Sequence, residues 1–399
     1  MNVSQTTHQT LFCILIGTLL ICGLVRPTSA SLQLAQSQIE SHELNPSVFH
    51  SYTNWQPLPL VYEFEVPYYQ QLTSVWCGPA ALEMLFDYYG PNIAQSEIAL
   101  AAATDSLGTY TSDMIRAAHY SYLSDTTDIP PDGFGMRQFG FPAYWHQWSG
   151  SYESISSSVK TLLLNDIPLL VLTYYDTSHS AGHYRVLKGY NDTSNNFILH
   201  DPWYSGIYQG PNETIDQTLL INNLWLQYSR WGMIIQPWTL DITSDTSPIL
   251  PNQNFTITAD ITCPCPDPFS RSQYPISAPT ANLTLPANFT IVSGPSPSLD
   301  LSSETSSIHW TCQAPSLFVN ESCEIAIEIY GSVSGVGVNA GAYTDMIGVN
   351  GTISIPCTAP PPPPFLYVEI VIVIIIIAIV ILVIIYVVRR RKNLETASL

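Results

Sequence analysis

One cysteine in the first third of the chain lies where a thiol could act as a nucleophile. Cys77 is placed where a loop turns into a helix, and Gly78 and Pro79 follow it. Glycine allows a tight approach, and proline suits a first helical turn, where its missing N–H costs nothing. The free N–H groups and the positive dipole end of a helix start lower the pKa of a thiol, and the thiolate is the reactive form. We therefore predict that Cys77 is a nucleophile.

A glutamine and a helix flank this cysteine. Gln71 precedes Cys77 by six residues and is placed to direct a side-chain N–H at an oxyanion next to the sulfur. Apolar residues at helical spacing predict a helix that ends at Gly90: Leu82, Leu85, Phe86 and Tyr89. The alternative is a buried cysteine beside a packing glutamine, and partners later in the chain decide between the two.

A predicted β-hairpin supplies two further groups that such a thiol needs. His183 is the first residue of a predicted strand over 183–190. The residues 191–196 are dense in Asn, Asp and Ser and indicate a turn. The return strand, 197–203, carries Asp201. The open end of this hairpin brings positions 183 and 201 together, as a base and its orienting carboxylate require. We predict that His183 is the base and that Asp201 fixes its tautomer.

Two other histidines are rival bases. Strand alternation should turn His200 to the opposite face from Asp201, and His179 lies in an unpatterned loop. Both therefore rank below His183.

The surrounding elements follow from hydrophobic spacing. Residues 124–151, rich in Pro, Gly and aromatic residues, are expected to form a loop that either lines a substrate cleft or packs as irregular coil. A buried strand is expected over 167–173. Helices are expected over 96–103, over 111–122 with Met114, Ala117 and Ala118 inward, and over 152–165.

The order of these pieces resembles the papain-like cysteine peptidases, and more closely the bacteriocin-processing (C39-like) peptidases, over residues 61–210. The matching motifs are Val66-Pro67-Tyr68-Tyr69, Cys77-Gly78-Pro79-Ala80, Tyr88-Tyr89-Gly90, Gly182-His183-Tyr184 and Asp201-Pro202. The resemblance implies a papain-like α+β fold, with Cys77 as nucleophile and Gln71 as oxyanion donor, and it agrees with His183 and Asp201 as the remaining partners. The bacteriocin exporters join such a domain to a transport domain and an ATPase. Neither is recognisable here, so the exporter function is not expected.

Composition argues against several classes of partner. The net charge is −19, and four of the 12 Lys and Arg residues lie at 389–392, so the rest of the chain is acidic. Nucleic acid needs basic patches and is not an expected partner. Motifs of the C-x-x-C, H-E-x-x-H and G-x-x-x-x-G-K types are missing from the peptidase-like region, so we expect no metal, nucleotide or other cofactor.

Two apolar runs indicate export and anchoring. The run 11–25 suits a signal peptide that ends near Ala30, but no Lys or Arg precedes it, so an uncleaved anchor is the alternative. The run 366–388 is long enough to span a membrane, and the basic residues 389–392 should stay cytoplasmic. The part between the runs is then extracellular, and its seven N-x-[ST] sequons agree with a glycoprotein: Asn191, Asn212, Asn254, Asn282, Asn288, Asn320 and Asn350.

Residues 239–358 show short alternating segments between Pro, Gly and Ser turns, which predict an antiparallel immunoglobulin-like β-sandwich. The region loosely resembles the CARDB-like modules of surface proteins. A stalk is the expected role, and carbohydrate or protein binding is the alternative. Its five cysteines favour disulfides, with Cys312 fitting Cys323, and Cys357 fitting either Cys263 or Cys265.

These observations predict a surface cysteine peptidase or amidase that acts on peptides or proteins by acyl transfer through Cys77. The alternatives are an adhesion or binding protein with a silent papain-like domain, and a transglutaminase-like acyl transferase. The expected parts are a signal peptide (1–30), a lead-in segment (31–60), a papain-like domain (61–238), a β-sandwich (239–358), a Pro-rich linker (359–365), a transmembrane helix (366–388) and a cytoplasmic tail (389–399).

Overall fold

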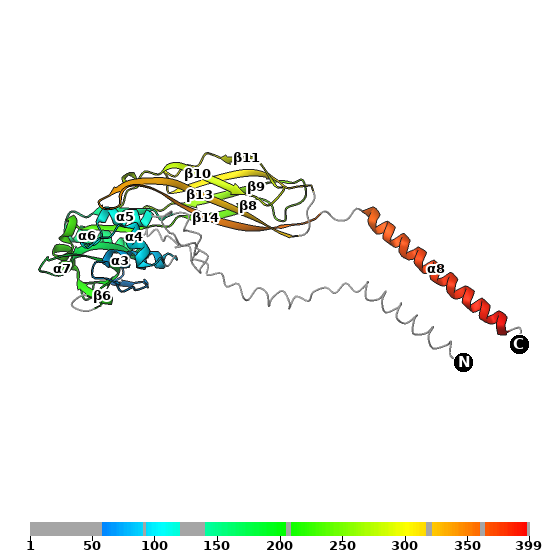
Figure 1. The fold of residues 1–399 in the computed structure, drawn as a ribbon, viewed down its shortest axis with the longest axis horizontal. Coiled ribbons are helices and arrows are strands. Elements are labelled where there is room, and N and C mark those ends of the chain that lie inside the picture. The colour runs from blue at the N-terminus through cyan, green and yellow to red at the C-terminus, as the bar shows by residue number, and fades with distance from the viewer. Residues whose placement is uncertain are drawn as a thin grey trace. The chain divides into compact units, whose positions relative to one another are not determined.

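The structure is a computed structural model that describes residues 58–90, 93–119, 140–204, 209–316, 321–359 and 364–396. The predicted signal peptide and nearly all of the lead-in segment lie outside these ranges. The described residues form an α+β domain, a β-rich region and a long helix near the C-terminus (Figure 1).

A seven-stranded sheet of the described residues is the centre of the α+β domain, with strand order β2-β7-β3-β4-β5-β6 and β1 paired with β4. Every neighbouring pair is antiparallel. Gly189 lets β1 approach β4 closely, because a Cβ there would lie 2.6 Å from the Tyr62 carbonyl oxygen. The strands are β1 (Val61–Glu63), β2 (Ala143–Gln147), β3 (Leu169–Tyr174), β4 (Gly182–Asn191), β5 (Asn196–Asp201), β6 (Gly210–Asp216) and β7 (Trp231–Ile235).

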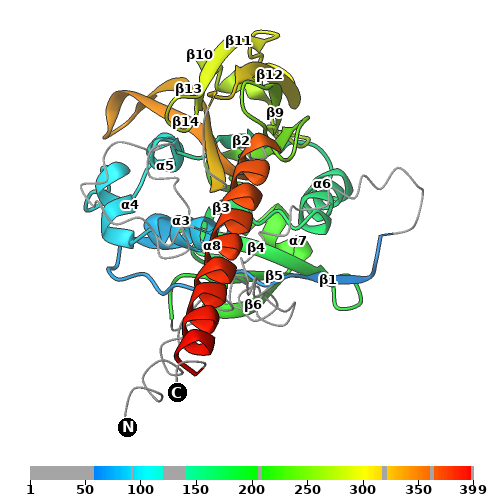
Figure 2. The ribbon, with the colours of Figure 1, turned by 90° about the vertical axis from the view of Figure 1, so that its right-hand side faces the viewer.

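Helices cover both faces of this sheet (Figure 2). One apolar core joins the sheet to α3 (Cys77–Tyr88), α4 (Gln95–Ala101) and α5 (Thr111–His119). The other joins it to α6 (Tyr152–Leu164), α7 (Gln217–Asn222) and the 3-10 helix η2 (Leu224–Ser229). Strand β3 contributes to both cores, because its side chains alternate between the two faces. The prediction of a strand buried on both faces is therefore confirmed.

The predicted helices are confirmed to within about two residues for α3, α4 and α6. In α5 the inward residues Met114, Ala117 and Ala118 are buried as expected, and the predicted continuation to residue 122 lies outside the described residues. The expectation of a loop throughout 124–151 is wrong, because residues 143–147 form β2, which pairs with β7 from Ala143 opposite Ile235 to Gln147 opposite Trp231. Residues 120–139 lie outside the described part of the chain.

The β-rich region consists of two antiparallel sheets among the described residues, β10-β13-β14 and β11-β12-β9-β8. A single apolar core includes Phe255, Ile257, Trp310, Ile325 and Ile327. Its immunoglobulin-like character and the domain boundaries stay predictions. The strands are β8 (Thr239–Ser244), β9 (Asn254–Thr262), β10 (Ser277–Thr284), β11 (Thr290–Ser296), β12 (Thr305–Gln313), β13 (Glu321–Gly337) and β14 (Gly341–Cys357), with a 3-10 helix η3 (Arg271–Gln273).

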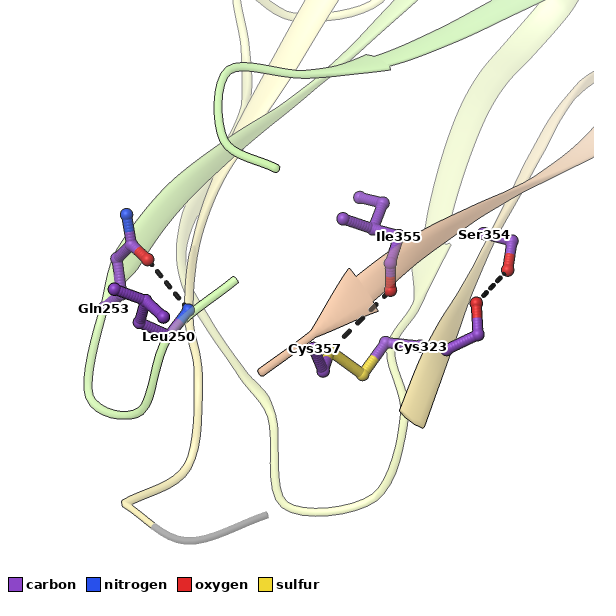
Figure 3. The surroundings of a disulfide bond; sticks show 7 residues. Leu250, Gln253, Cys323, Ser354, Ile355 and Cys357 are labelled. Carbon is purple, nitrogen blue, oxygen red and sulfur yellow. Dashed lines mark hydrogen bonds between the residues drawn. A yellow bond between two sulfur atoms is a disulfide. The ribbon is translucent and has the colours of Figure 1, made fainter. Parts of the chain in front are cut away.

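A disulfide joins Cys323 of β13 to Cys357 of β14 (Figure 3). Cys323 lies opposite Ile355, two residues from Cys357, so the bond crosses between paired strands. The predicted pairing of Cys312 with Cys323 is therefore wrong, and so is the predicted bond from Cys357 to either of two upstream cysteines. The described cysteines that remain free are Cys77, Cys263, Cys265 and Cys312.

The last helix, α8 (Pro364–Thr396), includes a 20-residue stretch, Val371–Arg390, that is long and apolar enough to cross a membrane. This stretch overlaps most of the predicted span 366–388. The helix already begins at Pro364, and residues 360–363 of the Pro-rich linker lie outside the described residues. Which end of α8 faces the cytoplasm stays a prediction.

The sequon asparagines differ in exposure. Asn191 is half-buried, and its Oδ1 accepts hydrogen bonds from the backbone N–H groups of Thr193 and Ser194. Asn320 lies outside the described residues. The others are exposed, as glycan attachment would require: Asn212, Asn254, Asn282, Asn288 and Asn350.

The tip between β13 and β14 contacts the α+β domain. The backbone N–H groups of Asn339 and Ala340 donate to the buried carboxylate of Asp113 in α5, at 3.0 and 3.1 Å. The side-chain Nδ2 of Asn339 donates to the Ala103 carbonyl oxygen at 3.2 Å and to Asp105 Oδ2 at 3.0 Å. Polar groups of the tip thus satisfy a carboxylate that would otherwise be buried without donors.

We expect Asp113→Ala to lower the free energy of unfolding of the full chain by about 1.5–3 kcal/mol, because the part-buried backbone N–H groups of Asn339 and Ala340 lose a charged acceptor. Urea unfolding followed by tryptophan fluorescence measures the change. Ser112→Ala is the matched control, because the Ser112 hydroxyl accepts from Val338 N–H at an exposed position, and its loss should cost less than about 0.5 kcal/mol. Equal effects of the two changes would contradict the assignment.

Candidate active site

Cys77 is the first residue of α3, and no side chain caps this helix. The backbone N–H groups of Cys77 and Gly78, at the first two positions of the helix, have neither an intrahelical acceptor nor a side-chain cap. Gly78 is needed beside the thiol, because a Cβ there would lie 2.9 Å from Met114 Sδ and 3.1 Å from the side chain of Thr109. A larger residue would push the start of α3 away from α5 and the loop before it.

His183 and Asp201 meet at the open end of the β4–β5 hairpin. The strands pair with Val186 opposite His200, which carries Asp201 to the level of the first residues of β4. His183 Nε2 lies 2.7 Å from Asp201 Oδ1, and both side chains are buried. Asp201 Oδ1 also accepts the backbone N–H of Trp203 at 2.8 Å. The bond to Nε2 leaves Nδ1 of the imidazole for another partner.

That partner is the sulfur of Cys77. Burial by itself raises the pKa of the Cys77 thiol, but the hydrogen bond and the positive charge of His183, with a backbone hydrogen bond from Tyr184, outweigh it, and the pKa is lowered. Burial lowers the pKa of His183, whereas Asp201 and Cys77 raise it, and the net shift is upward. The two shifts favour the thiolate and imidazolium together over the neutral pair.

Gln71 forms hydrogen bonds both to the residue that follows Asp201 and to the turn that leads into Cys77. Its backbone N–H donates to the Pro202 carbonyl oxygen at 2.9 Å, directly after Asp201. Its Nε2 donates to the Thr73 carbonyl oxygen at 2.6 Å, which also accepts from Trp76 N–H at 3.4 Å in the turn that leads into Cys77. An amide nitrogen carries two hydrogens, so one N–H of Gln71 remains for an oxyanion. Its buried Oε1 has no hydrogen-bond partner.

The two rival histidines make hydrogen bonds elsewhere. His200 Nε2 lies 2.8 Å from the Val66 carbonyl oxygen, and its Nδ1 accepts the backbone N–H of Asn212 at 3.1 Å. Both of its ring nitrogens are therefore used by the backbone. His179 is exposed, its Nε2 lies 3.0 Å from Asn223 Oδ1, and its ring stacks on Tyr174.

The sequence reasoning missed two residues that contact this group. Arg185 Nε donates to Asp201 Oδ2 at 2.7 Å, and neither side chain is exposed. The ring of Tyr175 lies edge-on to His183, with centroids 5.5 Å apart. A signal for Arg185 exists in the sequence, because a charged residue two positions after His183 shares its face of a strand that otherwise reads as apolar. Among the described residues, no group of three or more His, Cys, Asp and Glu could hold a metal ion.

The fold and this group of side chains define an α+β domain with a cysteine at a helix start and a histidine and an aspartate on neighbouring strands. Residues 63–231 match the model of the Peptidase_C39 like family. This segment is therefore similar to the C39-like peptidases, which confirms the resemblance recognised in the sequence. No curated protein matches the chain.

Two solved structures illustrate the relatives that the chain is similar to. One is the peptidase domain of Streptococcus ComA, a bi-functional ABC transporter involved in quorum sensing, with 18% identity over 43% of this chain and 99% of that chain, and a TM-score of 0.31. The other is a double glycine motif protease from an AMS/PCAT transporter in complex with the leader peptide, with 16% identity over 44% of this chain and 94% of that chain, and a TM-score of 0.30. The similarity to this family rests on the family match and not on these superpositions.

We expect iodoacetamide to alkylate Cys77 rapidly at pH 6. The lowered pKa leaves a larger fraction of Cys77 as thiolate at this pH than an ordinary cysteine has, and the rate should fall as the pH drops through that lowered pKa. His183→Ala should slow the reaction at pH 6, by roughly tenfold for each unit by which the pKa of Cys77 rises.

Peptide mapping by mass spectrometry measures this reaction and includes its own controls. Burial raises the pKa of Cys263 to about 12 and that of Cys312 to about 11, so both should stay unmodified in the folded chain. A Cys77 that reacts no faster than a free cysteine, with or without His183, would contradict the proposed ion pair.

Proposed function

We propose that this chain is a membrane-anchored, extracytoplasmic cysteine peptidase or amidase that acts on peptide or protein substrates at the cell surface. The observation that carries the proposal is the row of Cys77, His183 and Asp201, in which a lowered thiol pKa and a raised imidazole pKa occur side by side within a C39-like domain.

Acylation would begin with attack of the Cys77 thiolate on a substrate carbonyl carbon. The C=O electrons move to oxygen and give a tetrahedral oxyanion. His183, protonated, then donates its proton to the leaving amine as the C–N bond breaks, which leaves an acyl thioester on Cys77. Asp201 holds the imidazole ring by its Nε2 throughout, so that Nδ1 keeps facing the sulfur.

Two kinds of donor would stabilise the oxyanion. The first turn of α3 offers backbone N–H groups without intrahelical acceptors. Gln71 adds a side-chain N–H, held by the bonds of its backbone to Pro202 and of its amide to Thr73. Such fixed donors favour the transition state because they need not reorganise as charge develops.

Deacylation would return the enzyme to its starting state. His183, neutral after the first step, removes a proton from water, and the resulting hydroxide attacks the thioester carbon. Collapse of the second tetrahedral intermediate expels the Cys77 thiolate and releases the carboxylic acid. The imidazolium that forms is again paired with Asp201.

The helix α8 would anchor the protein. The apolar stretch Val371–Arg390 can span a bilayer by its length and composition, and the basic residues 389–392 favour a cytoplasmic position for the end that follows it. The peptidase domain would then work outside the cell, with the β-rich region between it and the membrane.

Incubation of the full chain with a peptide library, followed by mass spectrometry, tests the activity. Cys77→Ala should abolish cleavage, and Gln71→Ala should lower turnover by roughly 10²–10³-fold, the usual effect of one lost oxyanion donor. Asp201→Asn should lower turnover through the tautomer of His183. Gln147→Ala is the matched control, because this side chain is exposed and its Nε2 donates to the Tyr228 carbonyl oxygen. Cleavage that persists in Cys77→Ala would refute the proposal.

The orientation of the anchor is tested separately. Protease added to intact cells should digest the part before α8 and spare an epitope tag placed after Leu399. Permeabilised cells should lose the tag as well, because the membrane then no longer protects it. A protected peptidase domain with a digested tag would show the opposite orientation.

A further inference from the structure

Arg185 is a completely buried cation in the middle of β4, two residues after His183. A guanidinium group has five N–H donors and cannot lose its charge in a protein. Burying it is costly unless acceptors and a counter-charge surround it. The position of such a group beside a candidate active site therefore calls for a physical reason.

Every nitrogen of this guanidinium has an acceptor. Nε donates to Asp201 Oδ2 at 2.7 Å, Nη1 to the Tyr174 carbonyl oxygen at 2.9 Å and to Thr173 Oγ1, and Nη2 to the Tyr175 carbonyl oxygen at 2.9 Å. Thr173 Oγ1 in turn donates to the carbonyl oxygen of His183 at 3.0 Å. Arg185 thus joins the carboxylate of Asp201 to the end of β3 and, through Thr173, to the backbone of the proposed base.

The charges form an alternating row. With Cys77 as thiolate and His183 as imidazolium, the sequence of charges from Cys77 to Asp201 is negative, positive, negative, and its sum is −1. Arg185 follows Asp201 and brings the sum to zero. A buried site tolerates separated charges far better when each has an opposite neighbour and the total is neutral.

We propose that Arg185 is a positioning residue of the peptidase site, which holds the Asp201 carboxylate in the orientation that lets His183 keep its thiolate partner. This inference rests on the proposed function. If its role were purely structural, Arg185 would only link β3, β4 and β5. Its loss would then lower the stability of the fold but leave the reactivity of Cys77 in the remaining folded molecules unchanged. The pH dependence of Cys77 separates these two roles.

The test measures Cys77 alkylation by iodoacetamide against pH in the full chain, by peptide mapping. Arg185→Met keeps the apolar stem and removes the charge and all donors. We expect the rate of Cys77 alkylation in this variant at pH 6 to fall roughly tenfold, so that the acid side of the pH–rate profile lies about one pH unit higher. The reason is that an imidazolium held less firmly by Asp201 stabilises the thiolate less. Arg185→Lys, which restores the charge with a single donor atom, should recover part of the loss. Peptide turnover should follow the same order.

Lys188 provides the matched control. It is also completely buried on β4, but its Nζ pairs with Glu63 of β1 at 2.6 Å. Lys188→Met should reduce stability and leave the pH profile of Cys77 unchanged. Modification of Cys312, which is buried in the other region, reports any molecules that have unfolded.

The outcomes are distinct. Fast alkylation of Cys77 in both the wild-type chain and a folded Arg185→Met variant would overturn this inference and leave the proposed function intact. A wild-type Cys77 that reacts like a free cysteine would instead overturn the proposed function. If Arg185→Met unfolds, the comparison moves to the Asp201→Asn background, where no carboxylate is left unpaired. In that background, equal pH profiles of Cys77 alkylation with Arg185 and with Arg185→Met support the inference that Arg185 acts through Asp201. A further shift of the profile in the double variant contradicts it.

Discussion

The complete burial of the Asp201 carboxylate is the constraint on which the candidate site depends. A buried carboxylate is tolerated only where donors and positive charge surround it. His183 and the Trp203 N–H supply donors to Oδ1, and Arg185 supplies one to Oδ2. These groups come from β4 and from the residues after β5. A slip of one residue between the two strands would turn the acceptor away from its donors, so the register and the site require each other.

The parts of the structure that follow from local pattern could be predicted from the sequence. The start of α3 at Cys77 reflects Gly78 and Pro79, and the β4–β5 hairpin reflects two apolar runs around a polar turn. Because hairpin geometry fixes which residues face each other at the open end, the proximity of His183 and Asp201 followed as well. Strand alternation likewise explains why His200 contacts the backbone at Val66 and not the Cys77 group.

The parts that depend on distant partners could not be predicted. β2 pairs with β7, almost ninety residues later, and nothing local marks its edge position. The bond between Cys323 and Cys357 needs the long pairing of β13 with β14, whose Gly- and Ser-rich residues 331–337 resemble a turn as much as a strand. Arg185 was visible as a charge on the strand, but its partners at the end of β3 depend on how three strands meet.

The loop between α4 and α5 connects the site to the β-rich region. The Thr109 carbonyl oxygen accepts from the Tyr184 hydroxyl at 2.9 Å, next to His183, and the Thr109 side chain closely approaches the position where Gly78 lacks a Cβ. At its other end, Asp105 accepts from Asn339 of the β13–β14 tip at 3.0 Å. The β-rich region supplies donors to this loop and to α5, so a continuous series of contacts joins its β13–β14 tip, through the 105–109 loop, to Tyr184 and Gly78.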